Sequence, residues 1–252
     1  MLSYNDLGTG NPVVLIHGLG SKKEAWLPQH DLANRYRLII PDMRGHGETV
    51  INEDLTVKNF ALDIINLLEY LNIPSAFICG LSLGGIVAQE LYKQRPDMVK
   101  GLILSNTTSY IPSILGNSII NNIYRLLQKG NQELIEQIVT TGLYDKVYKE
   151  EARNAFYIRD TYIEAAKAPI GLNYFSVLPA IRKPVLLIGS THDKVTPSSN
   201  IYLMKSFIRH SQTVLLENTG HLSNIEKKDL FNQHVSDFIA TCASSCYEQT
   251  VG

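Results

Sequence analysis

Six short apolar runs recur along the chain and restrict most strongly the folds open to it. They read "PVVLIHG" (12–18), "RLIIPD" (37–42), "AFICG" (76–80), "GLILSN" (101–106), "PVLLIG" (184–189) and "QTVLLEN" (212–218). Each run is apolar throughout instead of alternating, which is typical of strands buried on both faces of a parallel sheet. Helical patterns separate the runs, the clearest over 57–71 with Thr56 as its N-cap. This alternation predicts a doubly wound α/β domain with a mostly parallel sheet.

The alternation is interrupted once, between 107 and 179, where only helical patterns such as "IINNIYRLLQ" and "QELIEQIV" occur. Because a strand pattern returns at 184–189, we interpret 107–179 as a helical insertion over one end of the sheet. A plain helical extension of the core is the alternative. The core then comprises 1–106 and 180–243, and we expect residues 244–252 to be a frayed tail.

Composition and charge exclude several classes of protein. The 252 residues are 44% hydrophobic and 19% charged, with a net charge of −1, and we find no basic stripe for a nucleic acid or a membrane surface. No apolar run approaches the ~18 residues of a membrane span, and the start "MLSYNDLGTGNP" has no signal-peptide pattern. Three cysteines without a C-x-x-C pair argue against a zinc site or a disulfide framework. We therefore expect a cytoplasmic protein.

One serine stands among glycines between a strand pattern and a helix pattern, in "ICGLSLGGIVAQ" (78–89). A reversal from strand to helix at Ser82 forces this residue into a strained conformation with positive φ. Gly80 and Gly84 have no Cβ to collide as the strand and the helix close on each other. The serine side chain is therefore expected to project from the carboxyl end of the sheet beside a helix N-terminus, as in a G-x-S-x-G nucleophile elbow.

A second glycine-containing loop, "HGLG" (17–20), directly follows the first apolar run. Its backbone can approach a bound oxygen closely. The amide N–H of Leu19, together with that of Leu83 after the serine, would form an oxyanion hole. His17 is expected to brace this loop and not to act as a base.

Two further side chains follow buried strand patterns. Asp193 lies in "GSTHDKVTP" (189–197), where a carboxylate can orient an imidazole, and His221 lies in "NTGHLSNIE" (218–226). With Ser82 they keep the chain order Ser, Asp, His. Glu217 is the alternative acid, although it directly precedes the loop of His221.

These motifs together resemble the α/β-hydrolase superfamily, namely "HGLG", "PDMRGHG", "GLSLGG", "HDKVTP" and "GHLSNIE". The likeness covers nearly the whole chain and is greatest to 3-oxoadipate enol-lactonases and related carboxylesterases. It implies that Ser82 is the nucleophile, His221 the general base and Asp193 its orienter, with Leu19 and Leu83 as oxyanion donors. It also implies a lid at 107–179. Many relatives begin with an antiparallel hairpin, whereas this chain starts at "LSYNDLG", so we expect seven strands instead of eight.

The leading functional interpretation is hydrolysis of a small carboxylic ester or lactone through an acyl-enzyme, which needs no metal or organic cofactor. Two alternatives remain open. One is a carbon–carbon bond hydrolase or a cofactor-free haloperoxidase that uses the same triad, and the other is a ligand-binding signalling protein of this fold. Arg125, Arg153 and Arg159 in the insertion could each meet a substrate carboxylate, but arginines on a helix surface are usually solvated.

Overall fold

The computed structural model describes residues 1–248 and contains one sheet of seven strands in the order β1-β3-β2-β4-β5-β6-β7. The strands are β1 (Tyr4–Leu7), β2 (Asn11–Ile16), β3 (Tyr36–Pro41), β4 (Ala76–Leu81), β5 (Val99–Ser105), β6 (Val185–Ser190) and β7 (Ser211–Leu216). All neighbouring strands are parallel except β1, which pairs with β3 antiparallel. The predicted α/β class, the mostly parallel sheet and the seven strands are confirmed.

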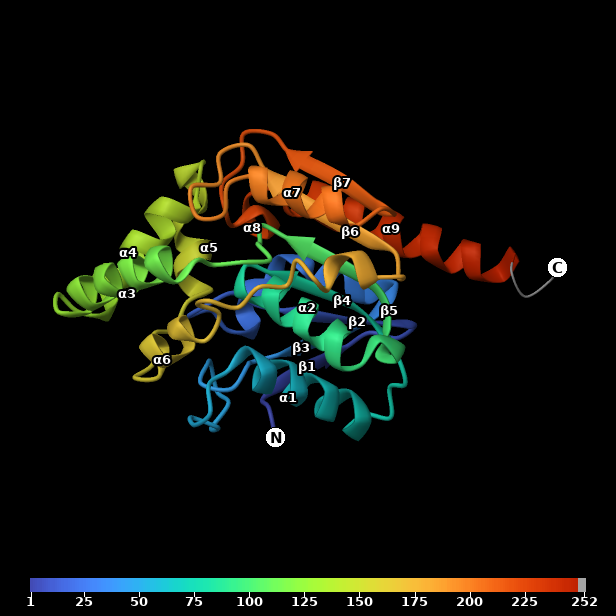
Figure 1. Ribbon diagram of the computed structural model, residues 1–252, viewed down its shortest axis with the longest axis horizontal. Helices are drawn as coiled ribbons and strands as arrows, with labels where there is room; N and C mark the ends of the chain where they lie inside the picture. The colour runs from blue at the N-terminus through green and yellow to red at the C-terminus, as the bar shows by residue number, and fades with distance from the viewer. Residues whose placement is uncertain (249–252) are drawn as a thin grey trace.

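Helices cover both faces of this sheet (Figure 1). One face carries α1 (Val57–Tyr70), α2 (Leu83–Gln94) and α7 (Ser199–Phe207), and the other carries the 3-10 helix η1 (Lys23–Asn34) and α9 (Lys228–Glu248). Shorter elements join them: η2 (Pro96–Met98), η4 (Leu178–Ala180) and α8 (Ser223–Glu226). The helix predicted at 57–71 is confirmed as α1, and its N-cap Thr56 accepts a hydrogen bond from the Asn59 amide at 3.2 Å.

The apolar character of the strands follows from burial on two sides. In β2, Val14 and Ile16 pack under α1 and α2, whereas Val13 and Leu15 pack under η1 and α9.

One strand, β7, differs from the expected burial on both faces. Most of β7 is only half-buried, and Gln212 is exposed. Because β7 pairs with β6 alone and lies at the sheet edge, an apolar run there does not imply burial on both faces.

The stretch 107–179 leaves β5 and returns to β6 through helices. They are α3 (Ser113–Leu127), α4 (Asn131–Gly142), η3 (Lys146–Tyr148), α5 (Lys149–Asn154) and α6 (Tyr162–Lys167). Figure 1 shows them at the end of the sheet where β5 and β7 terminate. Backbone pairing joins them to the loop after β2, since the Tyr157 amide donates to Gly20 O at 2.9 Å and the Lys22 amide to Ala155 O at 3.2 Å.

The last helix, α9, continues to Glu248 and projects from the body in Figure 1. The frayed tail expected at 244–252 stays a prediction. The last four residues of that segment, 249–252, lie outside the described residues.

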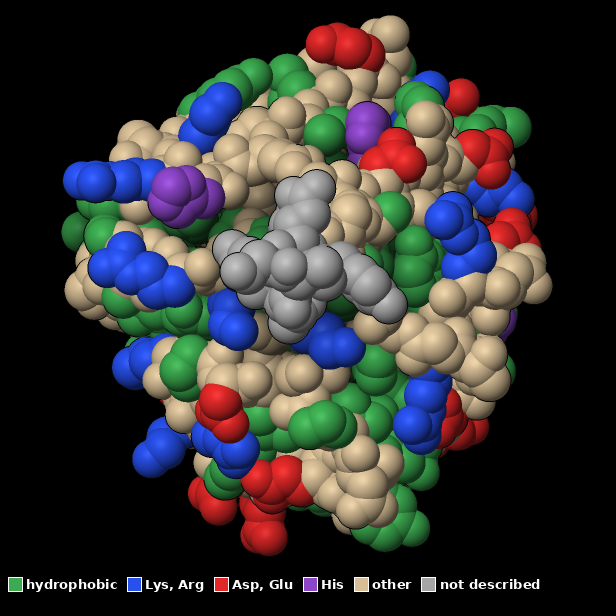
Figure 2. Space-filling model, turned by 90° about the vertical axis from the view of Figure 1, so that its right-hand side faces the viewer, with side chains coloured by type: hydrophobic (Ala, Val, Ile, Leu, Met, Phe, Trp, Pro, Cys, Tyr) green, Lys and Arg blue, Asp and Glu red, His purple; other side chains and the backbone are tan. Residues whose placement is uncertain are grey.

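The side of the molecule remote from the stretch 107–179 carries charges of both signs (Figure 2). Figure 2 shows Lys and Arg side chains spread over this face with Asp and Glu among them. Within residues 1–248, no helix is both long and apolar enough to span a bilayer. The cytoplasmic location and the lack of nucleic-acid or membrane partners stay predictions.

Candidate active site

Ser82 is the single residue between the last residue of β4 and the first residue of α2. Its backbone has φ 55° and ψ −119°, a region that costs an L-residue about 1–3 kcal/mol. The two flanking glycines are required sterically. A Cβ on Gly80 would lie 2.2 Å from Gly84 O, and a Cβ on Gly84 would lie 2.1 Å from Ile16 O.

Neighbouring strand ends hold this turn in place. The Ser82 amide donates to Ser105 O at 3.0 Å, and Thr107 Oγ1 donates to Ser82 O at 2.6 Å. Both partners come from the end of β5. A Cβ on Gly85 would lie 2.6 Å from the Thr107 side chain, so the third glycine of "GLSLGG" is needed for this contact.

Two backbone amides near Ser82 are available to a ligand. Leu83 is the first residue of α2, where an N–H has no partner inside the helix. Leu19 lies in the loop after β2, and among the described residues its amide donates to no protein group. Gly18 brings this loop against the serine, because a Cβ built on Gly18 would lie 3.4 Å from Ser82 Cβ.

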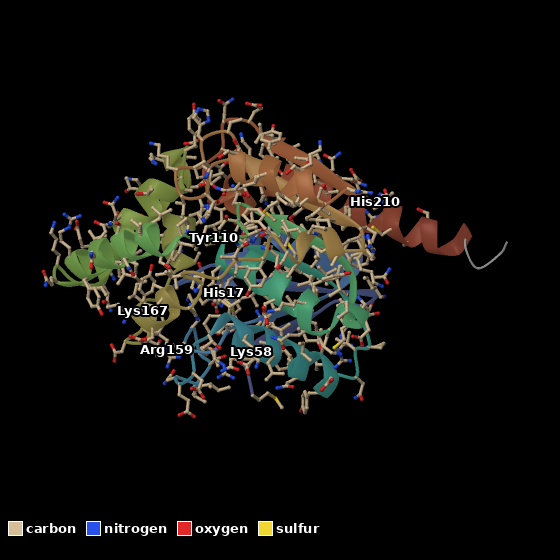
Figure 3. The ribbon with its side chains drawn as sticks, in the orientation of Figure 1. His17, Lys58, Tyr110, Arg159, Lys167 and His210 are labelled. Carbon is tan, nitrogen blue, oxygen red and sulfur yellow. The ribbon has the colours of Figure 1, made fainter. Side chains whose placement is uncertain are left out.

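His17 braces the same loop. It is fully buried, and its Nδ1 lies 2.8 Å from Gly18 O while its Nε2 lies 3.1 Å from the Met43 amide. A carbonyl can only accept and an amide N–H can only donate, so the imidazole is neutral with its proton on Nδ1. Burial lowers the pKa of His17 in agreement. Figure 3 shows His17 near the middle of the molecule, far from the exposed His210.

His221 and Asp193 meet at the ends of β6 and β7. His221 Nδ1 lies 2.9 Å from Asp193 Oδ2, and both residues are buried. Because a carboxylate only accepts, the imidazole proton lies on Nδ1 and Nε2 is left as the basic nitrogen. Glu217, the alternative acid, is exposed, and His221 contacts Asp193 instead.

The carboxylate of Asp193 is saturated with donors. Oδ1 accepts the Val195 and Thr196 amides at 2.8 Å each, and Oδ2 also accepts Thr196 Oγ1 at 2.8 Å. Burial alone would raise the pKa of Asp193, but the charge and hydrogen bond of His221, with the other donors, outweigh it and lower the pKa to about 2. The group is therefore ionised throughout the physiological range.

One further partner of Asp193 was missed by sequence reasoning. Asn106, fully buried at the end of β5, donates from Nδ2 to Asp193 Oδ2 at 2.9 Å and to Ser190 Oγ at 2.9 Å. Its Oδ1 accepts Ser223 Oγ at 2.7 Å. The sequence signal that could have found it is the position of Asn106 at the end of the strand pattern "GLILSN" (101–106).

Glu226 is a second residue that sequence reasoning missed. Its buried carboxylate accepts the Gly220 amide at 2.8 Å and, from the segment after α4, the Tyr144 amide at 2.9 Å and the Asp145 amide at 2.8 Å. Burial raises the pKa of Glu226 despite these donors. Gly220 directly precedes His221, so one side chain fixes the histidine loop to the helical insertion.

Ser82 and His221 open into the same cavity, of about 610 Å³. Its walls come from the loop after β2, from α3 and α4, and from α6. Among the described residues no hydrogen bond joins Ser82 Oγ to His221 Nε2, and such contacts are often long until a substrate binds. Lys194 is the one Lys, Arg, Asp or Glu among the described residues that line the cavity.

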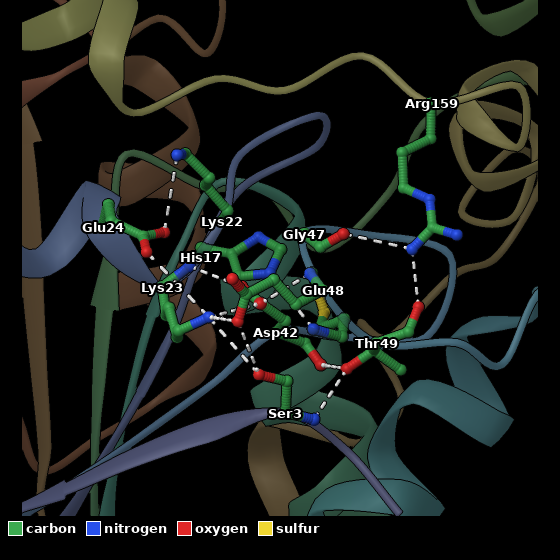
Figure 4. A network of polar contacts seen from close by, with 11 residues as sticks. Ser3, His17, Lys22, Lys23, Glu24, Asp42, Gly47, Glu48, Thr49 and Arg159 are labelled. Atoms are coloured by element: carbon green, nitrogen blue, oxygen red, sulfur yellow. Dashed lines mark hydrogen bonds and ion pairs between the residues drawn. The ribbon is translucent and has the colours of Figure 1, made fainter.

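None of the three insertion arginines lines the cavity. Arg159 donates to Gly47 O at 3.1 Å and Thr49 O at 2.6 Å, as Figure 4 shows. Arg153 pairs with Glu136 and Glu150, and Arg125 donates to Asn122 Oδ1 at 2.6 Å. Arg159 is therefore not simply solvated, because it ties the insertion to the loop after β3.

In the described part of the chain, no three His, Cys, Asp or Glu side chains are grouped as a metal ion would need. The expectation that no metal or cofactor takes part stays a prediction.

Comparisons with known proteins show the family of the chain and the proteins it is similar to. A family model described as "Alpha/beta hydrolase family" matches residues 13–233. The chain is 28% identical to 3-oxoadipate enol-lactonase 1 of Acinetobacter baylyi, over 90% of this chain and 88% of that protein. It is 26% identical to (E)-2-((N-methylformamido)methylene)succinate hydrolase of the same organism, over 94% of both. A solved esterase from Thermogutta terrifontis superposes with a TM-score of 0.86 at 26% identity, covering 96% of this chain and 93% of the esterase.

Proposed function

Because this chain belongs to the alpha/beta hydrolase family, we propose that it is a serine hydrolase that cleaves a carboxylic ester or lactone of a small substrate. Ser82 is the nucleophile, His221 the general base and Asp193 the residue that orients it. One observation carries the proposal. A strained serine and the free Nε2 of a histidine, whose Nδ1 is bound 2.9 Å from a buried carboxylate, open into one cavity.

Acylation follows from these positions. A serine hydroxyl is a weak nucleophile at neutral pH, so His221 Nε2 takes its proton as Ser82 Oγ attacks the substrate carbonyl. Asp193 keeps the imidazole proton on Nδ1 and stabilises the imidazolium that forms. The Leu19 and Leu83 amides donate to the oxyanion of the tetrahedral intermediate, each contributing about 3 kcal/mol.

Release completes the cycle. His221 returns its proton to the leaving alcohol, and water activated by the same nitrogen then attacks the acyl-enzyme. Helices of the stretch 107–179 act as a lid that shields the acyl-enzyme from bulk solvent. Support for the lid comes from α3 and α4, which line the same cavity as Ser82.

Covalent labelling and turnover test the proposal together. A fluorophosphonate probe should label the native protein and not Ser82→Ala, and hydrolysis of p-nitrophenyl butyrate should fall at least about 10⁴-fold in this variant. Ser206→Ala, an exposed serine on α7, is the matched control and should keep both activities. Melting temperatures of both variants should stay close to that of the native protein.

Each contrary outcome has a distinct meaning. Labelling that persists in Ser82→Ala would remove this serine as nucleophile. Labelling without turnover of any ester or lactone would favour a carbon–carbon bond hydrolase, a haloperoxidase or a ligand-binding protein built on the same three residues.

A further inference from the structure

One buried tyrosine differs from the others in its hydrogen bonding. Tyr36, Tyr92, Tyr162 and Tyr174 are each at most 6% exposed. Three of their hydroxyls have protein partners: Tyr36 with Ser236 O, Tyr92 with Ala180 O and the Arg182 amide, and Tyr174 with Glu90. Among the described residues, no group bonds the hydroxyl of Tyr162. Its oxygen is not among the polar atoms that are enclosed without a partner, so it stays accessible, and a ligand in the cavity can bond it.

Tyr162 is also the buried tyrosine that lines the cavity of Ser82. It lies on α6, and its ring packs on Gly20, where an added Cβ would lie 2.4 Å from the ring. Gly20 directly follows Leu19, so the tyrosine stands beside the proposed oxyanion loop. Burial raises the pKa of Tyr162, and the phenol therefore stays protonated and able to donate at neutral pH.

A second unpaired hydroxyl lies on the same wall. Ser21 is 3% exposed and lines the cavity, and among the described residues its Oγ has no partner. The polar side chains on the α3 and α4 wall differ, because they are bonded within their own helices. Ser118 Oγ donates to Ile114 O at 3.1 Å, and Gln137 Nε2 donates to Thr141 Oγ1 at 2.9 Å.

We propose that Tyr162 and Ser21 form a subsite for a second oxygen of the substrate, separate from the scissile carbonyl. The inference rests on the proposed hydrolase function and narrows its substrate class. That class is a small ester or lactone with a ketone, ether or hydroxyl oxygen on its acyl or alcohol part. An all-carbon analogue of the same size would displace water from these hydroxyls without replacing its hydrogen bonds, which carries a free-energy cost, so the site should discriminate against it.

Two pairs of esters of matched size test the subsite. On the acyl side the pair is p-nitrophenyl 4-oxopentanoate and p-nitrophenyl 4-methylpentanoate, and on the alcohol side 2-methoxyethyl butyrate and butyl butyrate. After division by the rates of alkaline hydrolysis, the native enzyme should prefer the oxygenated member of at least one pair about tenfold in kcat/KM, the effect of one hydrogen bond. Tyr162→Phe should abolish this preference, leave the all-carbon ester within about twofold, and keep the melting temperature.

The controls separate the subsite from a structural role. Tyr202→Phe, on an exposed tyrosine of α7, should leave the preference unchanged, and Ser21→Ala should reduce it. A native enzyme with no preference in either pair, or a preference that survives in Tyr162→Phe, would overturn the inference.

A binding measurement tests, without turnover, whether the subsite binds the second oxygen. Calorimetry on Ser82→Ala should give about tenfold tighter binding of the oxygenated ester, and Ser82→Ala/Tyr162→Phe should lose this difference. Failure of the native protein to hydrolyse any ester would reject the proposed function, whereas equal binding of both members of each pair would reject the subsite alone.

Discussion

Asp193 shows at the scale of one residue how tightly the site is specified. One of its carboxylate oxygens accepts hydrogen bonds from His221, Asn106 and Thr196, and the other accepts two backbone amides. Because every neighbour of the carboxylate is a donor, a side chain at position 193 must accept hydrogen bonds at both of its terminal atoms. An amide of the same shape cannot do so, since its NH₂ would face a donor in either orientation.

Asp193→Asn should therefore lower kcat/KM about 10⁴-fold, since the imidazole loses the group that keeps its proton on Nδ1. A stopped-flow burst of p-nitrophenol measures the acylation step directly. Glu217→Gln is the control because Glu217 is exposed and lies just before the same loop. If Glu217→Gln were crippling and Asp193→Asn mild, the choice of acid would be wrong.

At the scale of elements, α8 connects the loop of His221 to the helical stretch 107–179. The Glu226 carboxylate accepts amides on both sides of this junction, and the Leu222 amide donates to Gly142 O at 3.1 Å. A Cβ on Gly220 would lie 2.4 Å from Gly142 O, so the two backbones are in direct contact. The position of His221, the proposed general base, therefore depends on the end of α4.

Glu226→Gln places an NH₂ group against one of the amides that the carboxylate now accepts. We expect the free energy of unfolding to fall by about 2–3 kcal/mol and kcat/KM to fall at least about tenfold, because His221 follows Gly220. Urea unfolding and ester turnover measure the two effects. Glu133→Gln, on an exposed position in the first turn of α4, should change neither. Native stability and turnover in Glu226→Gln would contradict this role.

Helices α3 and α4 also limit the substrate's length. Their apolar side chains form one wall of a cavity of about 610 Å³, which suits a small ligand. We expect p-nitrophenyl acetate or butyrate to exceed the laurate or palmitate in kcat/KM. A series of acyl lengths measured below the critical micelle concentration tests this. Faster turnover of the long chains, with activation at a lipid–water interface, would indicate a lipase.

Across the whole molecule, two buried neutral histidines couple stability to pH. Burial, together with the neighbouring His17, lowers the pKa of His46 to about 3, and burial lowers the pKa of His17. In the unfolded chain both take up protons below about pH 6.5. Stability is thus fully present above pH 6.5 and is lost as the pH falls towards 3.

His46 should lower the free energy of unfolding by about 1.4 kcal/mol per pH unit in this window, and the lowered pKa of His17 adds to the same trend. Urea titrations between pH 6.5 and 4 measure the slope. His46→Gln should reduce the slope of the unfolding free energy against pH by the contribution of about one bound proton. His210→Gln, at an exposed position, should leave the slope unchanged. Equal slopes in the native protein and His46→Gln would show that His46 is already charged in the folded state.

The sequence could predict what depends on local pattern. Ser82, Asp193 and His221 each directly follow a strand pattern, and parallel strands bring their carboxyl ends to one edge. What it could not predict depends on contacts between distant segments. Asn106 meets Asp193 across 87 positions and Glu226 meets Tyr144 across 82, and neither residue type indicates its partner. The exposure of β7 likewise follows from its place at the edge of the sheet, and the sequence of a single strand does not indicate the strand order.

The strand order has a consequence for synthesis on the ribosome. β1 to β5 can already pair as 1-3-2-4-5 when β5 is complete, but β6 follows only after residues 106–184. At the usual 5–20 residues per second, β5 is an uncovered edge for roughly 4–16 s. It is apolar on both faces and open to pairing with another nascent chain. Chains arrested before residue 184 should therefore pellet in cell-free translation and stay in the supernatant once β6 is included. Equal solubility of both would show that the insertion covers β5 first.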